Sequence, residues 1–127
     1  MAELNHTIVW CSDKARSAEF LTGILGLPPA RTFHHFLVVD LSNRVSLDFF
    51  QKEGPVARQH YAFLVSEAEF DAAFARIEDQ ALAYWADPAR TRRGEINRHD
   101  GGRGVYFEDP DGHLLEIITR PYGSAKI

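Results

Sequence analysis

Two histidines and one glutamate are the residues of this sequence best suited to bind a metal ion. His6, His60 and Glu116 are far apart along the chain, but each lies in a run of apolar and β-branched residues typical of a strand. Because strand side chains alternate between two faces, each of the three shares its face with apolar neighbours. A carboxylate among apolar side chains is costly to bury unless a cation neutralises it. The pattern predicts a divalent metal site formed by His6, His60 and Glu116.

Two imidazoles and one carboxylate leave coordination positions open for substrate, water or dioxygen. A structural zinc site fills four positions and usually draws on several cysteines, whereas this sequence has only Cys11. We therefore expect a catalytic metal that binds a small-molecule substrate. Fe(II), Mn(II) or a related ion suits this set of ligands.

The order of apolar runs predicts the elements that position the ligands in the first half. Asp13 can accept hydrogen bonds from the first amides of a helix, and Gly26 can end that helix in a left-handed conformation. The helix over 13–25 would follow a strand over about 4–11 and precede three short strands, over about 30–33, 36–41 and 45–50. Its buried face would comprise Ala18, Leu21 and Leu25.

The same order restarts at His60. A strand over 60–65 precedes a helix that runs to about residue 80, where Ser66 and Glu69 have the spacing of a capping box. Strands then follow over about 82–86, 103–108 and 113–119, with a long polar loop over 87–102 that is typical of a lid or binding loop. The sequence thus predicts one α+β domain over 1–127, built from a duplicated βαβββ module over about 4–50 and 58–119.

Composition excludes several classes of protein. The chain has 127 residues, a formal net charge of −4 and 45% hydrophobic residues, which favour a single folded domain and give no basic surface for nucleic acid. No apolar stretch approaches the length of a membrane span, and the first residues lack a signal-peptide core. We therefore expect a cytoplasmic protein that binds neither nucleic acid nor membrane.

Several segments resemble the vicinal oxygen chelate superfamily, which includes glyoxalases, fosfomycin-resistance proteins, bleomycin-binding proteins and extradiol dioxygenases. The resemblance covers nearly the whole chain and rests on residues 4–6, 24–27 and 60–63 and above all on the run from Val105 to Glu116. It implies paired βαβββ modules that form a curved mixed sheet with helices outside. It also implies that His6, His60 and Glu116 are the metal ligands and that the protein is a homodimer.

The final hairpin is similar to the signature of the ring-cleaving extradiol dioxygenases, through Asn97, His99, Tyr106, Asp109, Pro110, Gly112 and Glu116. The resemblance implies that His99 lies near the substrate and that Tyr106 hydrogen-bonds a metal-bound substrate oxygen. Tyr106 also shares strand parity with Glu116 on the neighbouring strand of the hairpin. Where those dioxygenases carry an acid-base histidine, this chain has Ser46 and Asp48, and its length fits the glyoxalase and fosfomycin-resistance branches.

Three functions follow from these patterns. The first is a ring-cleaving dioxygenase-like enzyme with Tyr106, His99 and Glu116 as catalytic residues. The second is a non-oxidative enzyme that uses Mn(II), Ni(II) or Zn(II), either a lyase or isomerase of a thiol adduct or a thiol transferase acting on an epoxide such as fosfomycin. In it Asp48 or Glu116 would assist proton transfer, and Arg120 would pair with a phosphonate or carboxylate. The third is a drug-binding module without chemistry, for which Trp10, Phe63, Trp85 and Phe107 offer aromatic surface. The predicted substrate-binding residues are Arg120, Asp48 and Trp10.

Overall fold

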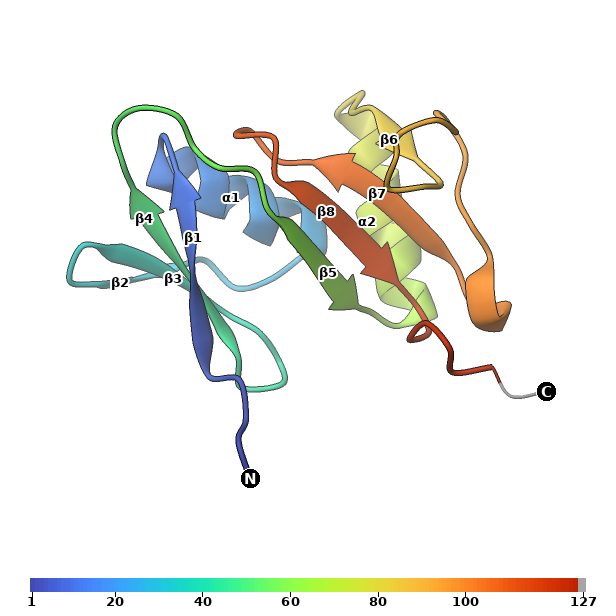
Figure 1. Cartoon of the computed structure of the whole chain (residues 1–127), viewed down its shortest axis with the longest axis horizontal. Helices are drawn as coiled ribbons and strands as arrows, with labels where there is room; N and C mark the ends of the chain where they lie inside the picture. The colour runs from blue at the N-terminus through green and yellow to red at the C-terminus, as the bar shows by residue number, and fades with distance from the viewer. Residues whose placement is uncertain (126–127) are drawn as a thin grey trace. The chain divides into compact units, whose positions relative to one another are not determined.

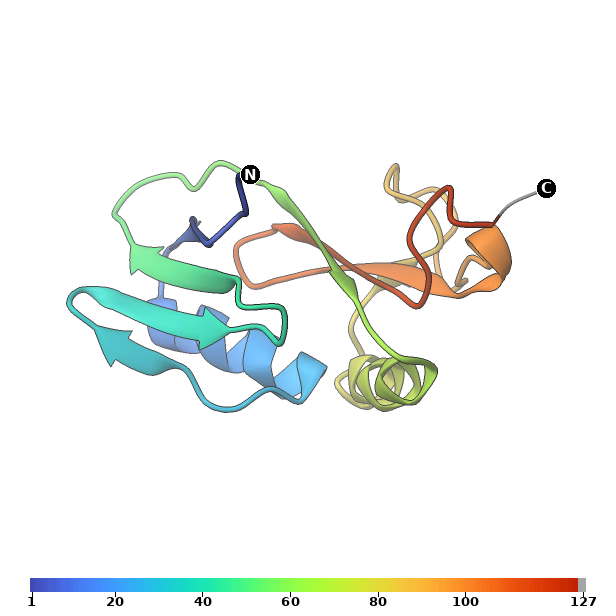
Figure 2. The ribbon, with the colours of Figure 1, turned by 90° about the horizontal axis from the view of Figure 1, so that it is seen from below.

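A computed structural model describes residues 1–125 and divides the chain into two compact units, Met1–Ala57 (unit 1) and Arg58–Ile127 (unit 2). Each unit has the element order βαβββ, which confirms the predicted duplication, and unit 2 adds a 3₁₀ turn before its third strand. In each unit the helix covers one face of that unit's own sheet (Figures 1 and 2). None of the described helices is long and apolar enough to cross a membrane.

Unit 1 contains a four-stranded mixed sheet in the order β1-β4-β3-β2. Its first strand pairs with β4 in parallel, and β3 pairs with both β4 and β2 in antiparallel fashion. The elements are β1 (His6–Cys11), α1 (Lys14–Leu25), β2 (Arg31–Phe33), β3 (Phe36–Asp40) and β4 (Ser46–Gln51). The alternation predicted for β1 is present, because His6, Ile8 and Trp10 are exposed on one face while Val9 and Cys11 are buried on the other.

The ends of α1 are formed as predicted. The Asp13 side chain accepts a hydrogen bond from the Arg16 amide, and Gly26 ends the helix with φ 67°. The predicted buried face was wrong at one position. Ile24 is fully buried, whereas Leu25 at the end of the last turn is only half-buried.

Unit 2 contains the second mixed sheet, in the order β5-β8-β7-β6, with β5 parallel to β8 and the other pairs antiparallel. The capping box predicted for α2 is formed by Ser66 and Glu69. Phe70 and Ile77 of this helix are fully buried, as are Phe107 and Ile117 of the sheet. The elements are β5 (His60–Leu64), α2 (Glu67–Asp79), β6 (Tyr84–Trp85), the 3₁₀ turn (His99–Gly101), β7 (Gly104–Glu108) and β8 (Leu114–Ile118).

Candidate functional site

Two of the three predicted metal ligands meet in unit 2. His60 lies at the start of β5 and Glu116 in the middle of β8, and these two strands are hydrogen-bonded neighbours. The Nε2 atom of His60 lies 3.2 Å from Oε1 of Glu116. The Glu116 side chain is 1% exposed, whereas that of His60 is 47% exposed. The pair therefore joins a buried carboxylate to an imidazole that solvent and small molecules can reach.

The hydrogen bond of the other ring nitrogen fixes the role of His60. Nδ1 lies 2.9 Å from the Leu114 carbonyl oxygen, which can only accept, so Nδ1 carries a proton. In the neutral ring, Nε2 then bears a lone pair that faces a carboxylate oxygen. The Nε2 lone pair and the negatively charged carboxylate oxygen repel each other unless a proton or a cation lies between them. Imidazole nitrogen and carboxylate oxygen therefore form a donor set that fits a divalent metal.

His6 in unit 1 also has an oxygen within hydrogen-bond distance of Nδ1. Its Nδ1 lies 2.7 Å from the side-chain oxygen of Asn5, which again leaves Nε2 as the acceptor in the neutral ring. Across residues 1–125, no group of three or more His, Cys, Asp or Glu residues gathers around a possible metal position. The structure thus brings His60 and Glu116 together in unit 2, whereas His6 lies at the start of β1 in unit 1.

Two tyrosines stand beside the Glu116 carboxylate. Tyr106 is the direct cross-strand partner of Glu116 in the β7–β8 ladder, as the predicted hairpin requires. The Tyr122 hydroxyl donates a hydrogen bond to Oε2 of Glu116 and lies 3.1 Å from the Tyr106 hydroxyl. Burial raises the pKa of both phenols, and the adjoining Glu116 raises them further, so both remain protonated donors near neutral pH.

Tyr122 is a site residue that the sequence pattern missed. It follows Pro121 beyond the end of β8, so strand parity no longer indicates where its side chain points. Asp100 holds this segment, because its carboxylate oxygens accept hydrogen bonds from the amides of Gly123 (2.9 Å) and Ala125 (3.2 Å). His99, beside Asp100 in the sequence, meets the Tyr122 ring edge-on with 5.9 Å between ring centroids.

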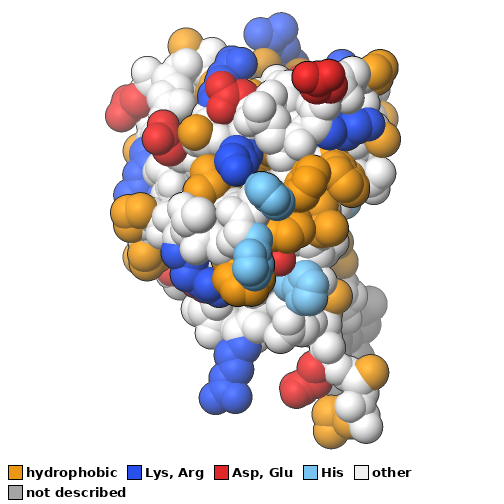
Figure 3. Space-filling view, turned by 90° about the vertical axis from the view of Figure 1, so that its left-hand side faces the viewer, with side chains coloured by type: hydrophobic (Ala, Val, Ile, Leu, Met, Phe, Trp, Pro, Cys, Tyr) orange, Lys and Arg blue, Asp and Glu red, His pale blue; other side chains and the backbone are white. Residues whose placement is uncertain are grey.

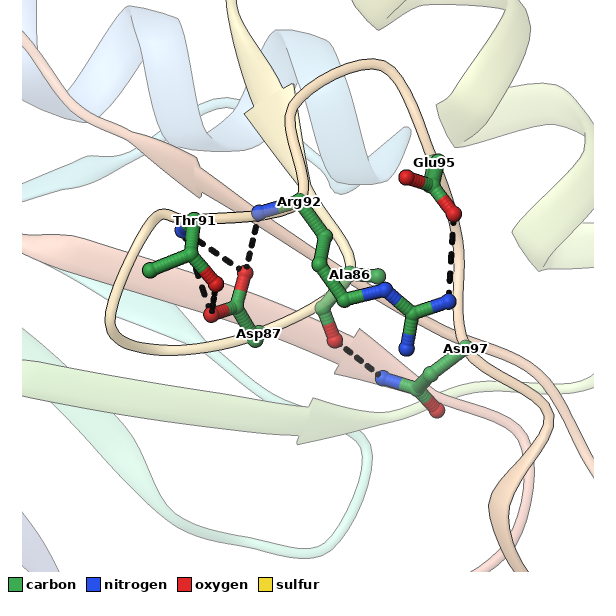
Figure 4. Close-up of polar contacts among 6 residues, drawn as sticks. All are labelled: Ala86, Asp87, Thr91, Arg92, Glu95 and Asn97. Carbon is green, nitrogen blue, oxygen red and sulfur yellow. Dashed lines mark hydrogen bonds and ion pairs between the residues drawn. The ribbon is translucent and has the colours of Figure 1, made fainter.

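The long loop over 87–102 is held by internal hydrogen bonds (Figure 4). Asp87 accepts from the amides of Thr91 and Arg92 and from the Thr91 hydroxyl, which closes the first part of the loop. Asn97 is buried and donates to the Ala86 carbonyl oxygen at 2.9 Å. Asn97 therefore ties the end of the loop to Ala86, two residues before His99.

Unit 1 carries an open cavity of about 400 Å³ on the exposed face of its sheet. Within it, Ser46 donates a hydrogen bond to Asp48 at 3.0 Å, so these two residues form one polar pair. Figure 3 shows histidine and hydrophobic side chains next to one another at the surface. The cavity is lined by Asn5, His6, Ile8, Arg31, Phe33, Phe36, Val38, Ser46 and Asp48.

The remaining predicted substrate-binding residues are exposed. Trp10 is 40% exposed and meets Phe50 edge-on with 5.2 Å between ring centroids. Arg120 lies past the end of β8, beside Gly101 and Gly102. His113 is fully buried and accepts a hydrogen bond from the Gln59 amide at 2.9 Å.

Comparison with known proteins identifies a family. Residues 3–117 match the family model described as "Glyoxalase/Bleomycin resistance protein/Dioxygenase superfamily". A glutathione transferase FosA from Serratia marcescens is 32% identical over 123 residues, which span 92% of this chain and 80% of that protein. A metallothiol transferase FosB from Shouchella clausii is 39% identical over 74 residues, which span 57% of this chain but only 45% of that protein's length.

Two solved structures are more similar still. The chain is 58% identical to "Oxidase ChaP-H1", with a TM-score of 0.96 over 98% of this chain and 100% of that one. It is 56% identical to "Oxidase ChaP-H2", again with a TM-score of 0.96, over 98% of both chains. The fosfomycin-resistance protein FosX from Mesorhizobium loti is 22% identical with a TM-score of 0.70, over 95% of this chain and 94% of that one, which shows a shared fold.

Proposed function

The chain belongs to the glyoxalase/bleomycin resistance protein/dioxygenase superfamily, and from this premise we propose that it is a metal-dependent oxidase. Its chemistry would resemble that of the ring-cleaving dioxygenases, acting on a small molecule that offers two neighbouring oxygens. The observation that carries the proposal is the buried Glu116 carboxylate, which faces the Nε2 atom of His60 at 3.2 Å. The name of the oxidases that share more than half of their residues with this chain supports an oxidative reaction.

His60 and Glu116 would hold the metal together with His6. All three offer the atoms that suit a catalytic divalent ion, and both histidines already donate through Nδ1 to an oxygen, as ligating histidines do. When bound, Fe(II) would supply Lewis acidity toward the substrate oxygens and a redox centre for dioxygen. Mn(II), Zn(II) or Ni(II) would also supply Lewis acidity toward the substrate oxygens.

Tyr106 would hydrogen-bond a substrate oxygen. A hydroxyl hydrogen can rotate, so Tyr106, the cross-strand partner of Glu116, can turn its proton from Tyr122 toward a substrate oxygen. The pKa of Tyr106 is raised, so its phenol remains a neutral donor, which suits stabilisation of an oxygen that gains negative charge. His99, which contacts the Tyr122 ring, would lie near the substrate at the edge of this site.

Residues of unit 1 would bind the rest of the substrate. Asp48 is the candidate proton acceptor there, since its carboxylate lies in the cavity lined by His6 and apolar side chains. Trp10 adds exposed aromatic surface on the same face of β1. Arg120 of unit 2 is exposed and would attract a substrate carboxylate.

An oxygen-uptake assay tests the proposed oxidase function. Protein stripped of metal by a chelator and then loaded anaerobically with Fe(II) is mixed with a panel of catechols and other dihydroxylated aromatics. We expect oxygen uptake that needs Fe(II) and falls at least about 100-fold in Glu116→Gln. Glu108→Gln, which alters a surface glutamate of β7 paired with Arg90, is the matched control and should retain uptake.

A thiol transferase is the second candidate, because the FosA relative from Serratia marcescens covers most of the chain at 32% identity. In that case the protein loaded with Mn(II) would consume an epoxide substrate such as fosfomycin in the presence of glutathione or another thiol, without oxygen uptake. Oxygen uptake without any thiol dependence would contradict it. A protein that shows neither activity and gains no stability from any divalent metal would favour the third reading, a drug-binding module.

The predicted homodimer belongs to the same proposal. Sedimentation velocity measures it directly, and a single species with the mass of one chain would contradict it. Mixing His6→Ala with Glu116→Gln then tests whether the ligands come from different chains. Recovery of metal binding in the mixture is expected only when His6 of one chain completes the site of another.

A further inference from the structure

The two oxygens of the Glu116 carboxylate have different partners. Oε1 faces Nε2 of His60 at 3.2 Å, whereas Oε2 accepts a hydrogen bond from the Tyr122 hydroxyl. The Glu116 side chain is 1% exposed, whereas His60 and Tyr122 are 47% and 48% exposed, so a buried carboxylate lies between two half-exposed partners. Each oxygen of the carboxylate therefore has its own partner, His60 at Oε1 and Tyr122 at Oε2.

We propose that Tyr122 is a positioning residue, which holds Oε2 of Glu116 so that Oε1 alone is offered to a metal ion shared with His60. This inference rests on the proposed function, because it concerns the same metal site. A carboxylate with both oxygens free can rotate about its last bond or bind a cation through both atoms. A hydrogen bond to one oxygen restricts that choice, and such partners of ligating groups commonly change metal affinity by about 10- to 100-fold when removed.

Tyr106 extends the same chain of hydrogen bonds. The Tyr122 hydroxyl has one proton, which it donates to Glu116, so a hydrogen bond across the 3.1 Å between the two hydroxyls requires Tyr106 as its donor. Donation from Tyr106 makes the Tyr122 proton a stronger donor to the carboxylate. The order Tyr106, Tyr122, Glu116 thus runs from the strand β7 through the C-terminal segment back to β8.

The hold on Tyr122 comes from a residue far from the carboxylate in sequence. Asp100 uses both side-chain oxygens to bind the backbone amides of Gly123 and Ala125, one and three residues after Tyr122. Asp100 itself has φ 56° and ψ 26°, a left-handed conformation that Asp, Asn and Gly tolerate better than other residues. We therefore infer that Asp100 acts on Glu116 through the position of Tyr122.

Four variants separate this role from a general effect on folding. Tyr122→Phe removes only the hydroxyl that reaches Glu116. Asp100→Gly removes both tethers and keeps the left-handed backbone relaxed, while Asp100→Asn retains one acceptor. Tyr84→Phe is the matched control, because it removes a phenol hydroxyl from the same unit where the ring packs edge-on against Phe74.

The probe is Co(II), whose visible absorption reports both affinity and coordination. We expect Tyr122→Phe to weaken Co(II) binding by about 10- to 100-fold and to change the absorption spectrum, with the melting temperature in chelator close to that of the wild type. Asp100→Gly should weaken binding in the same direction, Asp100→Asn should recover part of the loss, and Tyr84→Phe should match the wild type in affinity and spectrum.

The result that overturns the inference is specific. If the wild type binds Co(II) and Glu116→Gln does not, but Tyr122→Phe keeps the wild-type affinity and spectrum, then the metal site stands and the positioning role is wrong. Equal losses in Tyr122→Phe and Tyr84→Phe would also overturn it. If the wild type binds no divalent metal, both the proposed function and this inference fall.

Discussion

Asn97 and Gly104 exchange two backbone hydrogen bonds, from the Asn97 amide to the Gly104 carbonyl at 2.9 Å and from the Gly104 amide back at 3.0 Å. This bridge closes the end of the long loop against the first residue of β7. The Asn97 side chain lies so close that a Cβ atom on residue 104 would stand 2.9 Å from Oδ1 and 3.0 Å from Nδ2. The Asn97–Gly104 bridge therefore holds the two ends of the segment that contains His99 and Asp100. Glycine is required at position 104 because a side chain there would clash with the Asn97 amide.

Gly104→Ala should destabilise the protein by about 1–3 kcal/mol, because its methyl group would displace the buried Asn97 amide. Urea unfolding followed by circular dichroism measures the change. In an Asn97→Ala background the obstructing amide is gone, so the same substitution should cost less than about 0.5 kcal/mol. Equal costs in the two backgrounds would contradict the contact.

Asn97→Ala should lower the free energy of unfolding by about 2 kcal/mol, since it leaves the Ala86 carbonyl oxygen without its donor in a buried place. Denaturant unfolding is again the measurement. Asn43→Ala, in the exposed turn between β3 and β4, is the control and should change stability by less than about 0.5 kcal/mol. A loss no greater than that of the control would show that the Asn97 amide bond contributes little.

Metal addition should stabilise the wild type but not Glu116→Gln. With Mn(II) at about 100 times its dissociation constant, linkage gives roughly 2.7 kcal/mol, or a rise of roughly 10 °C in melting temperature. Without metal, Glu116→Gln should be as stable as the wild type or more so, because it removes a buried charge and keeps an acceptor for Tyr122. Differential scanning fluorimetry with Mn(II) and with chelator measures both values; equal Mn(II) shifts in the two proteins would exclude Glu116 as a ligand.

Acid should loosen the first part of the long loop. The hydrogen bond from Thr91, with those from neighbouring backbone amides, holds the pKa of Asp87 below its ordinary value of 3.8. A lowered pKa means that the ionised form stabilises the folded loop, fully above the ordinary pKa and progressively less as the pH falls through the lowered one. Hydrogen exchange of the Thr91 amide, measured by NMR, should therefore lose protection below about pH 4. In Asp87→Asn the protection should be weaker and nearly independent of pH in this range.

Local patterns in the sequence account for most of the secondary structure. Asp13, Gly26 and the Ser66–Glu69 capping box act over three or four residues, so both ends of α1 and the start of α2 follow from neighbours in the chain. The alternation in β1 likewise places His6 on the exposed face, and the hairpin turn at Gly112 aligns Tyr106 with Glu116. The incorrect prediction that Leu25 is buried also comes from relying on local patterns alone. Periodicity does not resolve which residue of the last helical turn faces the sheet.

The sequence by itself determined the duplicated βαβββ order and the choice of His6, His60 and Glu116 as candidate ligands. These follow from residue types and from periods of two and 3.6 residues, which are properties of the local backbone. Only the tertiary structure decided that Tyr122 reaches Glu116 and that Asp100 holds it there, and it alone revealed the buried structural role of Asn97. Those contacts depend on how loops close between distant residues, and no local periodicity encodes the path of an irregular segment in space.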